Sequence, residues 1–253
     1  MNIRETRAAG GYEWTPDFWQ SWREARNPYR YFKSQRDRSI ALELLVPRAG
    51  DRILEVGCGY GWISEALWQV APVEWLGVDR SEEMLRRLRS SPHPQAASSM
   101  VADATHLPFA DCSFDKVLCT GVLMHIADDA AALSEMARVL RPGGRFLCSI
   151  NNALSPYSCL TRLWNLFKPG FVQEFRWPRR FRRHLRELGL QPQAMAGDGI
   201  LTSVSFANRH ISIPPRCLFP FLHAIDVRIL PRWPGLAYEV WFAALKYSPT
   251  CVS

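Results

Sequence analysis

The sequence predicts an α/β fold in which helices cover both faces of a parallel sheet. Between residues 52 and 150, short apolar runs rich in β-branched residues alternate with helical patterns, which is typical of such sheets. A glycine-rich turn at residues 57–61, Gly-Cys-Gly-Tyr-Gly, follows the first apolar run. Ligands of open α/β sheets bind outside the carboxyl ends of the strands, so this turn is the first candidate for a binding site.

The expected strands of this region alternate with the expected helices. The strands are Arg52–Val56, Glu74–Asp79, Ser99–Asp103, Phe114–Thr120 and Arg145–Ile150, and the helices lie near residues 61–70, 81–90 and 128–140. Ser81, followed by two glutamates, is expected to cap a helix, as is Asp128. The run Leu140-Arg-Pro-Gly-Gly144 predicts that the last helix ends there.

The flanking regions belong to the same predicted domain, because no linker separates them. We expect one domain over residues 1–253, with a helical cap at 1–50, a cofactor-binding half at 51–150 and a substrate-side half at 151–253. The further expected elements are helices at Ser34–Leu45, Ser155–Lys168 and Pro178–Leu188 and strands at Gln193–Asp198 and Ala237–Lys246. Residues 199–235 are rich in proline and aromatic residues without a clear period, which indicates a lid-like insertion before the last strand.

Composition excludes several protein classes. No apolar run reaches 18 residues, so no membrane-spanning helix is expected, and the N-terminus lacks the apolar core of a secretory signal. The seven cysteines are scattered without a C-x-x-C motif, which argues against a disulfide framework and a zinc site. A reducing cytoplasm is therefore the expected location.

The net charge of +7 comes almost entirely from arginine and permits anionic partners. The clearest basic segment is the expected helix Pro178–Leu188, where arginines occupy one face and apolar residues another. It is either an ordinary helix with solvated arginines or a weak peripheral contact with an anionic membrane. The apolar insertion 199–235 is likewise either packed as a lid or able to enter lipid. No separate RNA-binding module is visible, which disfavours a nucleic-acid partner.

The spacing of the glycines separates three classes of ligand. A phosphate-binding P-loop requires a Gly-Lys-Ser/Thr sequence that is absent here, and dinucleotide sites use G-x-G-x-x-G rather than the G-x-G-x-G found here. Glu55 precedes the first glycine and suits a cationic amino group, whereas Asp79, about 20 residues further on, suits ribose hydroxyls. These features describe a ligand with an amino-acid end and a nucleoside end, which fits S-adenosylmethionine.

Four segments, in order, resemble the motifs of class I methyltransferases of the type-11 or ubiquinone/menaquinone subgroup. They are E-V-G-C-G-Y-G (55–61), V-D-R-S-E-E-M-L (78–85), A-D-A-T-H-L-P-F-A-D-C-S-F-D (102–115) and V-L-R-P-G-G-R-F (139–146). The resemblance covers roughly residues 52–150. It implies a Rossmann-like, doubly wound sheet of seven mostly parallel strands in the order 3-2-1-4-5-7-6, with strand seven antiparallel.

The resemblance also implies which residues contact S-adenosylmethionine. The methionine end is expected to contact Glu55, Gly57, Cys58, Gly59 and Gly61, and the ribose is expected to contact Asp79. The adenine is expected to contact Arg80, Met84, Asp103 and Ala104, and the sulfonium Thr120 and Gly121. The product would be S-adenosylhomocysteine. Met84 is equally well explained as a core residue of its helix.

Methyl transfer is an in-line displacement in which the protein aligns the acceptor with the methyl group and sulfur. A hydroxyl acceptor must also lose its proton, and His125, which follows strand four, is the candidate general base. The alternative is a structural histidine that hydrogen-bonds a loop. Asp128 and Asp129 suggest a metal pair, but Asp128 is better explained as a helix cap, so no metal is predicted.

The stretch Thr120-Gly-Val-Leu after strand four lacks the Asn/Asp-Pro-Pro-Tyr motif of enzymes that methylate adenine amino groups. We therefore expect an apolar or amphipathic small molecule, such as a lipid, a quinone precursor or a specialised metabolite. Tyr12, Trp14 and Tyr31 are expected to line its pocket together with His125. The alternatives are a methyltransferase acting on RNA or protein, and a non-catalytic protein that binds S-adenosylmethionine.

Overall fold

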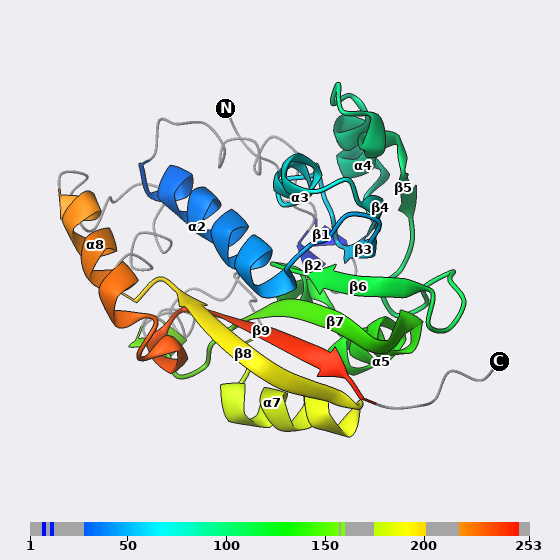
Figure 1. Cartoon of the computed structure of the whole chain (residues 1–253). Helices are drawn as coiled ribbons and strands as arrows, with labels where there is room; N and C mark the ends of the chain where they lie inside the picture. Colours follow the sequence, from blue (N-terminus) through cyan, green and yellow to red (C-terminus); the bar gives the residue numbers. More distant parts are fainter. Residues whose placement is uncertain are drawn as a thin grey trace.

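The structure is a computed structural model (Figure 1). It describes residues 7–8, 11–12, 28–156, 158–159, 175–200 and 218–247. The strands are β1 (Arg7–Ala8), β2 (Gly11–Tyr12), β3 (Arg52–Val56), β4 (Glu74–Asp79), β5 (Ser99–Val101), β6 (Phe114–Cys119), β7 (Leu140–Asn151), β8 (Leu190–Asp198) and β9 (Glu239–Lys246). The α-helices are α2 (Pro28–Leu45), α3 (Ser64–Val70), α4 (Glu82–Arg89), α5 (Asp129–Val139), α7 (Pro178–Glu187) and α8 (Phe219–Ile229), and short 3₁₀ helices are η1 (Pro94–Ala97), η2 (Leu123–His125) and η5 (Pro234–Leu236).

The main sheet has seven strands in the order β5-β4-β3-β6-β7-β9-β8. The first five pair in parallel, and β9 is antiparallel to both of its neighbours, β7 and β8. In order along the chain this is 3-2-1-4-5-7-6, so the expected topology is confirmed. β1 and β2 form a separate antiparallel pair.

Helices cover the sheet on both faces, as Figure 1 shows. On one face, α2, α3 and α4 contribute Ile40, Leu67 and Leu85 to a core with Trp241 of β9. On the other face, residues of α5 and α7 such as Met136 pack against β6, β7 and β9. Because both faces of the inner strands are buried, these strands are mostly apolar, with Glu55 in β3 and Lys116 in β6 as buried charged exceptions.

The predicted caps of α4 and α5 are confirmed, whereas α2 begins at Pro28 rather than at Ser34 and α3 begins at Ser64. The Ser81 hydroxyl accepts from the Met84 amide, at 3.3 Å, and the Asp128 carboxylate accepts from the Ala131 amide, at 2.9 Å. Helix α5 ends at Val139, as expected, but β7 starts at once, at Leu140, rather than at Arg145. Leu140 pairs with Phe114, and the register then shifts before Arg145 pairs with Lys116, so the Pro-Gly-Gly segment forms an irregularity inside a strand.

The second half departs further from the expectation. Strand β8 starts at Leu190 and includes Pro192, which an edge strand tolerates at a register irregularity. The insertion 199–235 is not aperiodic in its described part, since residues 219–229 form α8. The helix predicted at Ser155–Lys168 lies mostly outside the described residues.

The cysteines in the described ranges are mostly free thiols. Cys119 and Cys148 are free and fully buried, as small apolar residues of a core are. Cys112, in contrast, is disulfide-bonded, because the spacing of cysteines along a chain does not determine which thiols meet in the fold. None of the helices in the described ranges has the length and apolar character needed to cross a bilayer.

A buried charge cluster joins the cap helix α2 to the last two strands. The Lys33 ammonium donates to Asp37 of α2 and to Glu239 of β9, both at 2.7 Å, and lies 3.5 Å from the Asp198 carboxylate of β8. All four side chains are buried. Asn151, Glu239 and Asp198 are paired across the sheet, so the cluster lies at the edge formed by the carboxyl end of β7.

The cluster contains one cation, Lys33, and three carboxyl groups. Burial raises the pKa of Asp37 well above its usual value and also raises the pKa of Asp198, and the Lys33 charge opposes both shifts. Because the folded state binds protons on these groups more tightly than the unfolded chain, stability falls as the pH rises through their folded pKa values.

Replacing Lys33 with methionine should therefore destabilise the protein in a pH-dependent way. We expect a loss of about 3 kcal/mol at pH 8, because the buried carboxylates lose their counter-ion. The loss should be smaller at pH 5, where protonation neutralises part of the cluster. Urea unfolding of wild type and variant at both pH values measures this.

The control is Arg183→Met, which removes a cation whose side chain is 74% exposed in its pair with Glu187 and should cost less than about 1 kcal/mol. A Lys33→Met loss that is equal at both pH values, or larger at pH 5, would contradict the account.

Candidate functional site

The glycine turn after β3 is bound to the end of β4 by its backbone. The amides of Gly57 and Cys58 both donate to the Val78 carbonyl, at 2.7 and 3.0 Å, and the Gly59 amide donates to the Asp79 carboxylate, at 2.9 Å. These bonds hold the turn at the edge formed by the carboxyl ends of β3 and β4, which is where the sequence placed the binding site.

The glycines of this region serve two different purposes. Gly57 has φ +74°, and a Cβ atom there would lie 2.2 Å from the Val122 Cγ2 atom in the loop after β6. Gly59 and Gly121 also have positive φ, but no atom lies within 4 Å of the Cβ position of either. Gly57 is therefore required by packing, whereas Gly59 and Gly121 leave their backbones open to a ligand.

Asp79 is a half-buried carboxylate that bridges the turn and the helix after β4. One oxygen accepts from the Gly59 amide and the other from the Ser81 amide, both at 2.9 Å. Burial raises its pKa, although these amide bonds and the Arg80 charge oppose the shift. The Asp79 carboxylate is held in a fixed orientation at the end of β4, which suits a group that accepts hydrogen bonds from the hydroxyls of a ligand.

Glu55 points into the protein rather than along the turn. It is 3% exposed, and one carboxylate oxygen accepts from the Ser64 hydroxyl, at 2.7 Å, and from the Trp75 indole, at 2.9 Å. Burial raises its pKa to about 7, although both hydrogen bonds oppose the shift. Its predicted role at the methionine end stays a prediction, and its observed contacts join β3 to α3 and β4.

The residues expected at the adenine lie on the segments after β4 and β5. Met84 is buried in α4, in agreement with a core residue, whereas Arg80 is exposed. Asp103 accepts from the amide and hydroxyl of Thr105, both at 2.8 Å, and these bonds lower its pKa. Ala104 is half-buried beside it.

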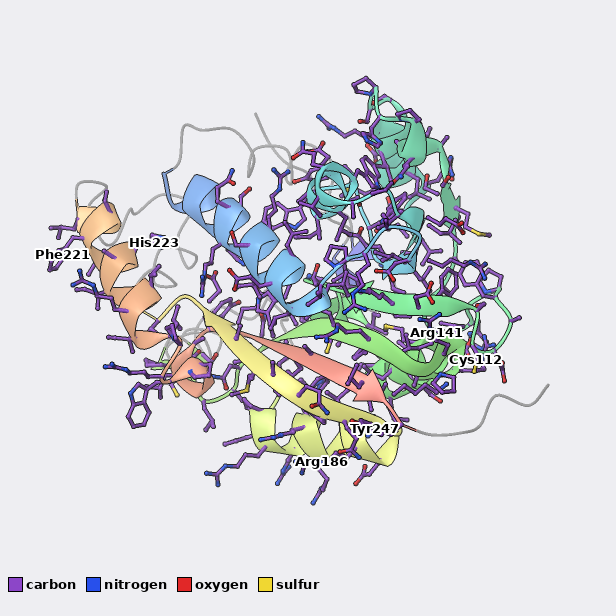
Figure 2. All side chains as sticks on the ribbon, in the orientation of Figure 1. Cys112, Arg141, Arg186, Phe221, His223 and Tyr247 are labelled. Atoms are coloured by element: carbon purple, nitrogen blue, oxygen red, sulfur yellow. The ribbon has the colours of Figure 1, made fainter. Side chains whose placement is uncertain are left out.

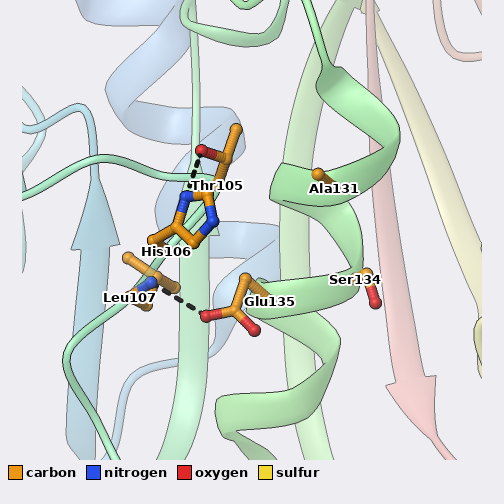
Figure 3. Close-up of a pocket in the computed structure, with 6 residues that line it drawn as sticks. All are labelled: Thr105, His106, Leu107, Ala131, Ser134 and Glu135. Carbon is orange, nitrogen blue, oxygen red and sulfur yellow. Dashed lines mark hydrogen bonds between the residues drawn. The ribbon is translucent and has the colours of Figure 1, made fainter.

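An open pocket adjoins this segment (Figure 3). Its lining, from the segment after β5 and from α5, consists of Thr105, His106, Leu107, Ala131, Ser134 and Glu135. The Leu107 amide donates to the Glu135 carboxylate, at 2.8 Å, and connects the two segments. The pocket therefore lies next to the predicted adenine contacts Asp103 and Ala104.

The loop after β6 forms the other side of the site. The Gly121 amide donates to the hydroxyl of Ser149, at 2.9 Å, next to Thr120. His125 ends η2 and is half-buried. Burial, followed by the nearby Arg80 charge, lowers the pKa of His125 to about 4. The imidazole is therefore neutral near pH 7 and able to accept a proton.

Several contacts of the site carried no clear signal in the sequence. Val122 looks like an ordinary apolar loop residue, and Ser149 is the only hydroxyl between buried residues at the end of β7. Of the predicted substrate-pocket residues, Tyr12 and Tyr31 are described in their backbone alone, and Trp14 lies outside the described residues. Their role stays a prediction.

The described residues include one group that has the composition of a metal site. Carboxylate oxygens of Asp37, Asp198 and Glu239 lie within 4.8 Å of one another, but the Lys33 ammonium already pairs with all three. The expectation of no metal stays a prediction.

Comparison with known proteins agrees with this geometry. Residues 54–148 match the family model described as a methyltransferase domain. This segment of the chain is therefore similar to a methyltransferase domain. The domain contains the glycine turn, Asp79, Asp103 and the loop that leads to His125.

Curated relatives support the same assignment. The chain is 40% identical over 134 residues to a demethylmenaquinone methyltransferase of Symbiobacterium thermophilum, a match that covers 48% of this chain and 52% of the relative. It is 31% identical over 159 residues to the 27-O-demethylrifamycin SV methyltransferase of Amycolatopsis mediterranei, covering 60% of this chain and 58% of that one. The chain thus spans little more than half the length of these relatives.

Among solved structures, the magnesium protoporphyrin IX methyltransferase of Synechocystis with bound S-adenosylhomocysteine has the same fold. Its TM-score is 0.63 at 18% identity, and the match covers 91% of this chain and 93% of that chain. At this identity the likeness establishes the fold alone.

Replacing Glu55 with glutamine should stabilise the protein at alkaline pH. The amide oxygen still accepts from Ser64 and Trp75, while the cost of ionising a buried carboxyl disappears. Because the folded pKa is about 7 and thus above the unfolded value, wild-type stability falls as the pH rises from about 4.5 through 7. The variant should gain up to about 3 kcal/mol at pH 8 and nothing at pH 4.

Chemical denaturation across this pH range measures the difference. Glu74→Gln, at a largely exposed position, is the control and should show no such trend. A Glu55→Gln variant that is less stable than wild type at pH 8 would show that the ionised carboxylate is favoured in the fold.

Proposed function

We propose that this chain is a methyltransferase that uses S-adenosylmethionine to methylate an apolar or amphipathic small molecule. The observation that carries the proposal is the pair Gly59 and Gly121, whose backbones leave open space on the two sides of one edge, beside the fixed carboxylate of Asp79. A ligand with an amino-acid end and a nucleoside end fits this arrangement, and two solved structures of the same fold hold S-adenosylhomocysteine or S-adenosylmethionine.

Different residues at the carboxyl ends of the strands contact different parts of S-adenosylmethionine. Asp79 is the acceptor for ribose hydroxyls, and Asp103 with Ala104 is the contact for adenine beside Met84. The glycine turn and the Thr120–Gly121 segment approach the methionine end and the sulfonium. S-adenosylmethionine, when bound, supplies an electrophilic methyl group, so the work of the protein is to align the acceptor and exclude water.

His125 is the proposed general base. Its imidazole is neutral at physiological pH because its pKa is about 4, so it accepts a proton from a hydroxyl acceptor without first having to lose one. A base of such low pKa is weak, which suits a phenolic acceptor, whose proton is more acidic than that of an aliphatic alcohol.

The substrate class follows from the relatives and from the apolar loop after β6. The named relatives act on demethylmenaquinone and on a demethylated rifamycin, and others are named O-methyltransferases. These names support a hydroxylated or quinone-like small molecule rather than a nucleic acid. Peripheral contact with a membrane is consistent with such a substrate.

The first test concerns Asp79. Asp79→Ala should weaken binding of S-adenosylmethionine by at least about tenfold, because a charge-assisted hydrogen bond is lost. Titration calorimetry measures this, with Asp111→Ala, an exposed carboxylate paired with Arg138, as the control.

Because Asp79 also holds the Gly59 amide, a second comparison isolates its contact with ribose. Wild type should prefer adenosine to 2′,3′-dideoxyadenosine, and the variant should lose this preference. Unchanged affinity for S-adenosylmethionine together with a retained preference would refute the assignment.

The second test concerns His125. With a hydroxylated acceptor from a lipid and metabolite extract, His125→Ala should lower turnover about 100-fold or more, while cofactor affinity stays unchanged. Wild-type turnover should be flat around pH 7 and fall as the pH drops through about 4, because the base must be unprotonated. His184→Ala on α7 is the control.

Near-normal turnover of His125→Ala would remove it as the base. Binding of the cofactor by wild type without any methylated product in the extract would contradict the proposed reaction itself.

A further inference from the structure

An unusual apolar surface lies on the helix before the last strand. We define the α8 surface by seven exposed side chains of residues 218–236, a segment that includes α8 and η5: Leu218, Phe221, Val227, Arg228, Arg232, Trp233 and Leu236. Phe221 is 64% and Trp233 is 63% exposed, which is rare for aromatic residues of this size. Figure 2 shows Phe221 pointing away from the body of the protein.

The exposure does not come from a loosely attached helix. Asp226 is 1% exposed, and its carboxylate accepts from the Ile200 amide, at 3.2 Å. Leu230 is also buried and packs in the same core as Ala237, at the start of the last strand region. The opposite face of α8 is therefore anchored, and the apolar face is directed outward by this anchoring.

The outward residues follow helical spacing. Phe221, Ala224, Val227 and Arg228 are exposed at intervals of three and four residues, which places them on one face. An ordinary surface helix presents polar residues to water and buries its apolar stripe. In α8, apolar residues occupy the exposed face as well as the inner one.

The charges of this surface have a single sign. Arg228 and Arg232 are exposed, whereas Asp226, the only acidic residue between residues 218 and 236, is buried. Apolar and aromatic side chains interspersed with arginine, without exposed acids, are the features of helices that lie in the interface of an anionic bilayer. Tryptophan is also favoured at this depth.

We infer that the α8 surface docks onto an anionic lipid bilayer. A second copy of the chain is a poorer occupant, because a two-fold contact through this surface would bring Arg228 and Arg232 toward their own copies. The inference does not depend on the proposed methyl transfer, since lipid binding is measured without a substrate. The arginines of α7 lie on a separate helix, along β8 (Figure 1), and are not part of this surface.

Sedimentation with lipid vesicles tests the inference on the full chain. Wild type should bind vesicles that contain phosphatidylcholine and phosphatidylglycerol, and should bind phosphatidylcholine alone at least about tenfold more weakly. The double variant Phe221→Ser/Trp233→Ser should lose about tenfold or more of its binding to the anionic vesicles. Arg228→Gln/Arg232→Gln should lose a similar factor on anionic vesicles alone.

The matched control removes the same charge elsewhere. Arg182→Gln/Arg186→Gln on α7, both exposed, should leave binding within about twofold of wild type, because those residues lie outside the α8 surface. All of these substitutions are at exposed positions, and a thermal melt verifies that each variant is folded.

Three results would overturn the inference. The first is wild type that fails to bind anionic vesicles. The second is an α7 control that weakens binding as much as the α8 charge variant, which would show attraction by net charge alone. The third is a dimer, measured by light scattering, that Phe221→Ser/Trp233→Ser dissociates, because the surface would then be occupied by a second copy.

Discussion

The candidate site depends on one close approach between two loops. The turn after β3 packs directly against Val122 in the loop after β6, and it does so because Gly57 has no side chain. Adjacent parallel strands are about 5 Å apart, so the loops at their ends lie very close together. Because Gly57 has no side chain, the two loops pack without a clash, and the backbones of Gly59 and Gly121 remain accessible. The hydrogen bond from Gly59 to Asp79 then sets the position of the turn relative to β4.

Much of this arrangement could be predicted because it is local. Short stretches of sequence were enough to predict the alternate glycines of the turn, the acid at the end of the next strand and the capping serine. The sheet order followed from the resemblance. The orientation of side chains was harder to predict. Glu55 carries the expected acidic group, yet it contacts Ser64 and Trp75, because a carboxyl on a buried strand binds whichever donors the fold brings to it.

The parts that could not be predicted depend on contacts between distant segments. Lys33 and Glu239 are 206 residues apart, and neither stands out in its own stretch of sequence. Their pairing joins the cap helix to the reversed end of the sheet, where β9 runs against its neighbours. The irregular start of β7 has a similar origin, since Leu140 continues directly from α5 into pairing with Phe114. A Pro-Gly-Gly run signals the end of a helix but not the tertiary partner that turns it into a strand.

Helix α8 shows how the buried polar groups and the exposed apolar groups are connected. Asp226 is buried, and its charge contributes to raising the pKa of Asp198. Rotating α8 to bury Phe221 and Val227 would expose Asp226 to water, but it would also break the Asp226 bond to the Ile200 amide and remove Leu230 from the core. The orientation of α8 is therefore a consequence of its inner contacts. An outward apolar face that is held in this way is presented to any surface that accepts apolar side chains and arginine together.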